Sequence, residues 1–213
     1  MEEDLGEPLN APVYGLPDLP EDSRLDAVLA AVLPASPAPT GLSPWPATAF
    51  GLDRSELFLQ LDPQAQARVL GAAAQVWLHE AWLIEQAGLL FTSRMVALAP
   101  THDERMLYAT FGADEARHLH LLTPWVDGRP MPGPFHHLLA RIIETSSRGT
   151  LVALVQVLLE GWGLRHYRDL QRSTHDPGLA EVLGAILHDE AHHHGAGAIR
   201  SEERRVGKEC RSR

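Results

Sequence analysis

A five-residue motif that occurs twice is the feature that most limits how this chain can fold. The sequence DEARH at residues 114–118 returns as DEAHH at residues 189–193, a displacement of 75 residues. Another glutamate precedes the glutamate of each copy by thirty residues, Glu85 in WLIEQAG and Glu160 in LLEGWG. Each copy contains Glu-x-x-His, which places a carboxylate and an imidazole on one face of a helix. The chain therefore contains an internal duplication of the form Glu, thirty residues, Glu-x-x-His.

Helical patterns surround both copies of the motif. Three sites have the residues of a helix start: Asp62-Pro63, Thr101 with Glu104, and Asp176-Pro177. The apolar pattern predicts long helices over about 63–99, 101–122, 150–172 and from 177 onward, with a short helix over 135–144 and a break over 145–149. No alternating strand pattern bounded by hairpin turns occurs. These features predict an all-α four-helix bundle with a long crossover between the second and third helices.

The spacing of the four glutamates has a geometric meaning. Their midpoints, residues 100 and 175, fall in the two predicted tight turns. Both glutamates of each antiparallel hairpin therefore lie about fifteen residues, or roughly 22 Å, from the turn. Packing the hairpins together brings four glutamates and two histidines into the bundle core. Buried carboxylates are costly unless neutralised, and two divalent cations would neutralise four of them.

This combined motif resembles that of the ferritin-like di-iron carboxylate proteins, over residues 62–199. The resemblance implies two irons, each served by one Glu-x-x-His pair, with the two upstream glutamates bridging or capping. The implied metal ligands are Glu85, Glu115, His118, Glu160, Glu190 and His193. The expected cofactors are two iron ions, and an oxygen-rich donor set also admits manganese. The alternative is a duplicated bundle whose buried polar residues hold no metal.

The aspartate before each Glu-x-x-His is expected to support a histidine. Metal-bound histidines usually donate their other ring N–H to an acceptor. In family members with the Asp-Glu-x-x-His form, the aspartate of one helix accepts from the histidine of the other. The resemblance therefore implies the pairs Asp114 with His193 and Asp189 with His118. The alternative is that both aspartates are solvated helix acids.

Other polar residues receive weaker assignments. Glu80 competes with Glu85, but it breaks the 75-residue symmetry and points about 140° away around the helix. We expect His192 and His194, which flank a ligand, to point away from the metals. We expect three further histidines to be surface or packing residues: His79, His120 and His188. Gly161 and Gly163, which flank Trp162, indicate either a pocket or helix irregularity beside the metals, or close helix packing.

An acidic, proline-rich arm precedes the predicted bundle over residues 1–61. Residues 1–50 hold nine of the sixteen prolines and eight acids against one base. Prolines at this density exclude a continuous helix or a central strand. Only residues 23–33 have a helical pattern, with Ser23 as the expected N-cap. We expect the arm to be a surface wrap or an extension rather than a binding motif.

Residues 200–213 resemble the in-frame translation of a common sequencing-library adapter, and all fourteen codons fit. Residues 1–199 contain twelve arginines and no lysine, whereas the tail holds the only lysine, Lys208, and the only cysteine, Cys210. We expect the tail to be an artefact that interrupts the fourth helix; the alternative is a natural basic tail. Without the tail, twelve arginines against 25 acids give a formal charge of −13 instead of −10.

Composition restricts the class of protein. No uninterrupted run of 18 apolar residues occurs, and the acidic N-terminus lacks the apolar segment of a secretory signal. A single cysteine cannot form an internal disulfide, which favours a reducing compartment and hence a cytoplasmic location. The net negative charge disfavours binding to nucleic acid or anionic lipid.

The leading functional hypothesis is an oxygen-dependent oxidase or oxygenase acting on a small organic substrate. The expected partners are that substrate, dioxygen and an electron-donor protein, with a second copy of the chain as a further candidate. A ribonucleotide-reductase radical role is disfavoured because Leu122 stands where that family member has its tyrosine. A tRNA-modifying hydroxylase shares the motif, but the acidic body argues against a tRNA substrate. The alternatives are ferroxidase or iron handling, and a non-catalytic helical interaction module.

Overall fold

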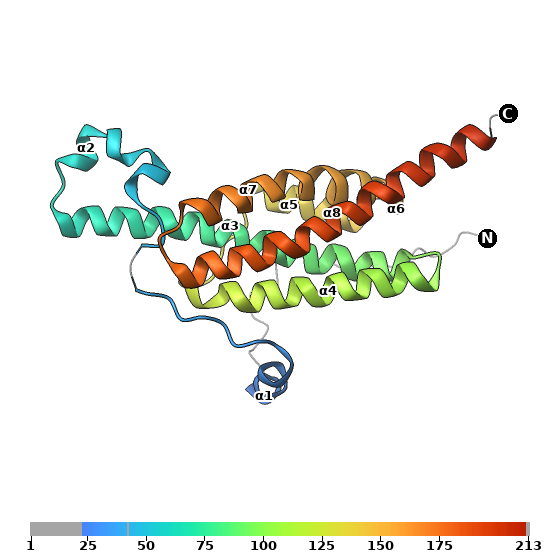
Figure 1. Cartoon of the computed structure of the whole chain (residues 1–213), viewed down its shortest axis with the longest axis horizontal. Coiled ribbons are helices and arrows are strands. Elements are labelled where there is room, and N and C mark those ends of the chain that lie inside the picture. The colour runs from blue at the N-terminus through green and yellow to red at the C-terminus, as the bar shows by residue number, and fades with distance from the viewer. Residues whose placement is uncertain (1–22, 42, 212–213) are drawn as a thin grey trace, which may run out of the picture.

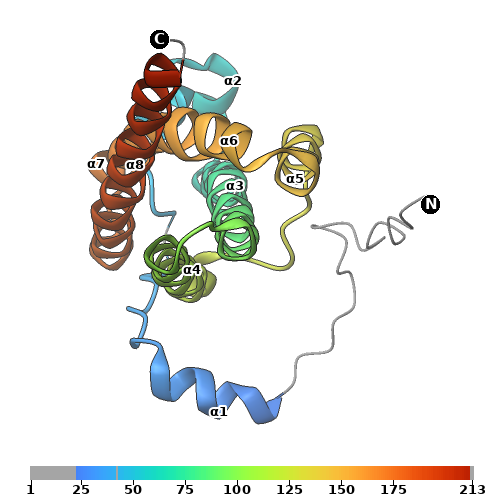
Figure 2. The ribbon, with the colours of Figure 1, turned by 90° about the vertical axis from the view of Figure 1, so that its right-hand side faces the viewer.

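The computed structural model describes residues 23–41 and 43–211, and every regular element in this part of the chain is a helix (Figure 1). The predicted all-α fold is therefore confirmed. The long helical segments are α3 (Pro63–Leu98), α4 (His102–Leu122), the consecutive α6 (Arg148–Leu151), η4 (Val152–Leu159) and α7 (Glu160–Ser173), and α8 (Pro177–Arg211). They pack as two hairpins, α3 with α4 and α7 with α8, which lie side by side (Figures 1 and 2).

The shorter elements lie outside these hairpins. They are α1 (Ser23–Val32), η1 (Ala47–Phe50), η2 (Leu52–Arg54), α2 (Glu56–Leu59), η3 (Thr123–Trp125) and α5 (Pro134–Thr145). Helix α5, which the sequence predicts to within a residue at each end, lies in the crossover between α4 and α6. It packs against α3. The crossover therefore adds a wall to the bundle rather than only spanning it.

Side-chain caps start the long helices where the sequence predicts. The Asp62 carboxylate accepts from the Ala65 amide at 2.8 Å, and the Asp176 carboxylate accepts from the Leu179 amide at 2.9 Å. The Thr101 hydroxyl likewise accepts from the amide of the first turn of α4. These bonds satisfy amide groups that have no partner within the helix.

The third long segment differs from the prediction in two ways. It begins at Arg148 rather than Thr150, because the Ser147 hydroxyl caps its first turn. Its middle part, η4, is a π-helix of eight residues, in which the amide of Glu160 donates to the carbonyl of Val155. The irregularity that the glycines suggested therefore exists, but it precedes them.

The buried apolar residues form two clusters along the bundle. One cluster gathers around Phe91, Met95 and Tyr108, and the other around Leu78, Leu122 and Ile186. On α4, at the start of α7 and on α8 the motif residues fall between the two clusters, and on α3 Glu85 lies between Leu83 and Ala87 of the first cluster. The fold therefore places a polar layer in the middle of an apolar core.

The proline-rich arm closes one end of the bundle. Trp45 is almost completely buried, and its indole N–H donates to the carbonyl of Leu170 at 3.0 Å. The Thr40 amide and hydroxyl both donate to the Asp176 carboxylate, so the arm is held at the α7–α8 turn. Helix α1, in contrast, projects from the bundle (Figures 1 and 2).

Some predictions fall on residues that the structure does not describe. These are residues 1–22 and 42 of the arm and the last two of the tail, and for residues 23, 24, 26 and 200–211 only the backbone is described. The origin of the tail stays a prediction. Among the described helices, none contains a stretch long and apolar enough to cross a membrane.

Candidate metal centre

The polar layer brings together the six residues that the resemblance implies as ligands. They are Glu85 on α3, Glu115 and His118 on α4, Glu160 at the start of α7, and Glu190 and His193 on α8. Their side chains form two groups whose ligand atoms lie within 4.8 Å of one another. One group is Glu85, Glu115, His118 and Glu190, and the other is Glu160, Glu190 and His193. Glu190 belongs to both groups, so its carboxylate joins them.

Both histidines turn the same ring nitrogen toward the carboxylates. His118 Nδ1 lies 2.8 Å from Glu85 Oε2 and 3.7 Å from Glu190 Oε1. His193 Nδ1 lies 3.4 Å from Glu115 Oε1 and 3.4 Å from Glu190 Oε1. Nδ1 is therefore the nitrogen that would bind a metal in each half of the site.

The opposite nitrogens meet the two aspartates across the helix pair. His118 Nε2 lies 3.1 Å from Asp189 Oδ2, and His193 Nε2 lies 3.2 Å from Asp114 Oδ2. Arg117, which sequence reasoning missed, donates to both aspartates at 2.8 and 2.6 Å. These are the pairs that the resemblance implies, and the aspartates can hold each ring with Nε2 protonated and Nδ1 facing inward. Their supporting role at a metal stays a prediction.

Burial and pairing strongly shift the pKa values in this layer. Burial raises the pKa of Glu160 well above its usual range, and the neighbouring charge of Glu190 adds to the effect. Although burial disfavours charged rings, the surrounding carboxylates raise the pKa of His118 to about 12 and that of His193 to about 11. Protons on these rings therefore balance the carboxylates where no metal does so. Hydrogen bonds from His118 and Arg117 lower the pKa of Asp189 to about 2.

The two upstream glutamates differ in their partners. Both oxygens of Glu85 are engaged, one by His118 and the other by the hydroxyl of Tyr167, which donates to it. In Glu160, Oε2 is buried and has no hydrogen-bond partner among the described residues. A cation at the Glu160, Glu190 and His193 group would supply that missing partner. Four carboxylates and two imidazoles also match the donors that iron and manganese accept in proteins.

Comparison with known proteins agrees with this geometry. A family model described as a ferritin-like domain matches residues 65–202, which is more than half of the chain. The chain belongs to the ferritin-like domain family. No curated protein and no solved structure matches this chain. Membership in this family and the Glu/His groups together support metal binding at the centre of the bundle.

A cavity reaches the carboxylates of the ferritin-like bundle from one side. It encloses about 70 Å³, and its wall contains the four glutamates together with mostly apolar side chains. Helix α5 contributes Phe135, Leu139 and Ile143, and α7 contributes Trp162 and His166. Phe135 is 44% and Trp162 53% exposed, so these two residues lie at its solvent side. Sequence reasoning missed the α5 residues, His166 and Tyr167, because only the packing of α5 and α7 places them there.

The two glycines near Glu160 have different roles. A Cβ added at Gly161 would lie 3.0 Å from the ring of His194, whereas one added at Gly163 would meet no atom within 4 Å. Gly161 therefore serves close helix packing, and Gly163 lies in the cavity wall. Both interpretations of this pair are correct, each for one residue.

The π-helical segment holds the polar layer from one side. Gln156 on η4 is fully buried, and its amide group donates to the carbonyl of His193 at 2.9 Å. Its amide oxygen accepts from the hydroxyl of Tyr108 at 2.8 Å. His194 Nδ1 lies 3.3 Å from the backbone carbonyl of Gln156.

The remaining candidates lie outside the layer. Glu80 belongs to neither ligand group, and its charge acts instead on His136 and His166. His79 Nε2 lies 2.8 Å from the carbonyl of Asp127.

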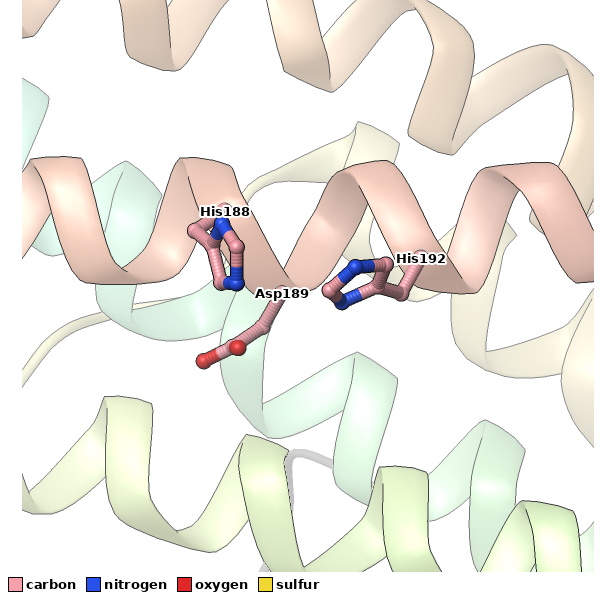
Figure 3. Close-up of side chains that lie close together, drawn as sticks. All are labelled: His188, Asp189 and His192. Atoms are coloured by element: carbon pink, nitrogen blue, oxygen red, sulfur yellow. The ribbon is translucent and has the colours of Figure 1, made fainter.

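His188 and His192 are exposed on α8 and form a third group of possible ligands with Asp189 (Figure 3). Their rings lie 4.7 Å apart, one helical turn from each other. Such a pair can bind zinc, copper or nickel, so it has to be controlled for in any metal count.

Proposed function

We propose that this chain is a non-haem di-iron oxidoreductase that uses dioxygen to oxidise a small organic substrate. The observation that supports the proposal is the cavity, because it joins an apolar surface directly to the carboxylates of the candidate metal centre. Apolar enclosed sites of this kind bind organic molecules. An iron-transport route, in contrast, would require hydrophilic groups leading away from the centre.

In this proposal the six side chains hold two irons, with His118 and His193 binding through Nδ1. Iron bound there would supply the redox chemistry that activates dioxygen. Asp114 and Asp189 keep the opposite ring nitrogens protonated. Tyr167 holds Glu85 in place.

The reaction also requires an external reductant. Hydroxylation of a C–H bond consumes one dioxygen, two electrons and two protons, and gives the alcohol and one water. The substrate supplies two of the four electrons that dioxygen accepts. An electron-donor protein supplies the other two. The apolar side chains of α5 limit the access of water to the site where this occurs.

The first test is the metal content. We expect protein loaded anaerobically with Fe(II) to retain two irons per chain after desalting, and Glu115→Ala to lose at least one of them. The variant His188→Ala/His192→Ala is the matched control, since it removes the exposed histidine pair and leaves the six ligands intact. Two irons in this control support the proposal. Zinc alone, or no bound metal, would contradict it, and a strict preference for manganese would replace iron as the cofactor.

The second test separates an oxygenase from a ferroxidase. We expect exposure to air to oxidise about two irons per chain in a single burst, because the described cavity wall is mostly apolar apart from the glutamates of the centre. Added Fe(II) should then not be turned over. Continued oxidation of tens of irons per chain, with mineral formation, would make ferroxidase the better assignment.

A further inference from the structure

One side chain in the cavity wall has hydrogen-bonding capacity that the protein does not use. His166 lies on α7, six residues after Glu160, and lines the cavity. Its Nε2 atom is buried and has no hydrogen-bond partner among the residues that the structure describes. Buried polar atoms normally have a partner, so an exception in a cavity wall indicates a position that a ligand can fill.

The ring of His166 is held in place by its neighbour. The indole of Trp162 stacks on it with centroids 5.2 Å apart and planes 7° from parallel. This contact limits the rotation of the imidazole and leaves the ring edge available for a hydrogen bond. The geometry is that of a pre-oriented polar group in a wall that is mostly apolar apart from the four glutamates.

The charge of His166 is also suited to a neutral ligand. Burial lowers the pKa of His166, and the opposing effects of Glu80 and Asp169 do not reverse the shift. A neutral imidazole can either donate or accept a hydrogen bond. The apolar side chains of the wall disfavour a charged ligand, because a charge would lose its hydration there, and the four glutamates repel an anion.

We propose that His166 determines substrate specificity by hydrogen bonding through Nε2 to the hydroxyl group of a small, neutral, otherwise apolar molecule in the cavity. The rest of that molecule lies between α5 and α7, beside the carboxylates. The inference rests on the proposed function only in calling this molecule the substrate. Binding of an alcohol at His166 requires no bound iron.

The test compares two probes that differ by one hydroxyl group, 4-fluorobenzyl alcohol and 4-fluorotoluene. Fluorine NMR titrations of the full chain measure the ratio of their dissociation constants. We expect His166→Leu to lower the preference for the alcohol at least fivefold, and His166→Gln to retain most of it, because glutamine keeps a hydrogen-bonding group. His188→Leu makes the same substitution at an exposed histidine on α8, and as the matched control it should leave the ratio unchanged.

A second measurement reports on the atom itself. The nitrogen chemical shift of His166 Nε2 should change on binding the alcohol and not on binding the toluene. An unchanged preference in His166→Leu, or no binding of the alcohol to the native chain, would overturn the inference. The iron content of His166→Leu separates this result from the proposed function. Loss of alcohol preference with two irons retained supports His166 as a specificity residue, whereas a native chain that prefers the alcohol but holds no iron contradicts only the di-iron proposal.

Discussion

Gly88→Ala is expected to weaken metal binding without unfolding the protein. Gly88 lies on α3 beside the carboxylate of Glu115 and lines the cavity. A Cβ added there would lie 2.5 Å from Glu115 Oε2, 2.6 Å from its Cδ and 2.9 Å from its Oε1. Atoms do not approach this closely, so Glu115 has to move. Because the clash involves the end of a flexible side chain, the carboxylate can rotate away while the helix stays intact.

The expected effects on stability and on metal affinity have opposite signs. Alanine in a helix interior is favoured over glycine by about 0.5–1 kcal/mol, so the metal-free variant should unfold at the same or a slightly higher urea concentration. Displacing a carboxylate that helps to hold the metals should reduce metal affinity about tenfold to a hundredfold, as for other groups that orient ligands.

The duplication offers a matched control in Gly163→Ala. Gly163 stands 75 residues after Gly88, follows Glu160 as Gly88 follows Glu85, and has no atom within 4 Å of an added Cβ. It should gain the same helical stability and keep its metal affinity. The assays are urea unfolding of the metal-free proteins and Mn(II) titration followed by electron paramagnetic resonance. Equal metal affinities in the two variants would refute the argument that Gly88 makes room for Glu115.

Two further substitutions and one measurement on the native chain test the electrostatics of the site. Tyr167→Phe removes the hydrogen bond to Glu85 and should lower the free energy of unfolding by about 1–3 kcal/mol in urea titrations of the metal-free protein; an unchanged value would contradict a stabilising bond. Asp189 has a pKa lowered from 3.8 to about 2 in the folded state, so its stabilising effect is complete above pH 4 and is lost as the pH falls toward 2. In Asp189→Asn the free energy of unfolding should therefore change less with pH between pH 4 and pH 2 than in the native chain. The same pH dependence in both proteins would oppose the assignment. Because the pKa values of His118 and His193 are raised to about 12 and about 11, both rings carry a proton at pH 7 that a metal must displace from Nδ1. Calorimetry of Mn(II) binding in two buffers of different ionisation heat should find at least two protons released per chain, with affinity rising with pH; release near zero would contradict protonated rings.

The bundle and its polar layer could be predicted from the sequence because the signals that specify them are local or periodic. The side chains of Asp62, Thr101 and Asp176 cap helices through bonds to amides three residues away, so neighbouring residues suffice to identify each start. Glu85 and Glu115 are equally far from their turn in sequence. Because each helical residue advances the chain by a fixed distance, the two glutamates lie at the same level along the hairpin. The 75-residue repeat predicts that the second hairpin has the same arrangement.

The tertiary structure alone decided how the two halves of the site differ. The repeat makes Glu85 and Glu160 equivalent, yet Tyr167 binds Glu85, whereas the position equivalent to Tyr167 in the first half is Thr92, whose hydroxyl donates to carbonyls of its own helix. The π-helix before Glu160 has no counterpart in α3. Side-chain contacts between helices depend on how each helix is rotated and shifted against its neighbours. That arrangement is set by close approaches such as Gly161 on His194, and by where the crossover lays α5 along α3. Such contacts join residues far apart in the chain, so no local pattern specifies them.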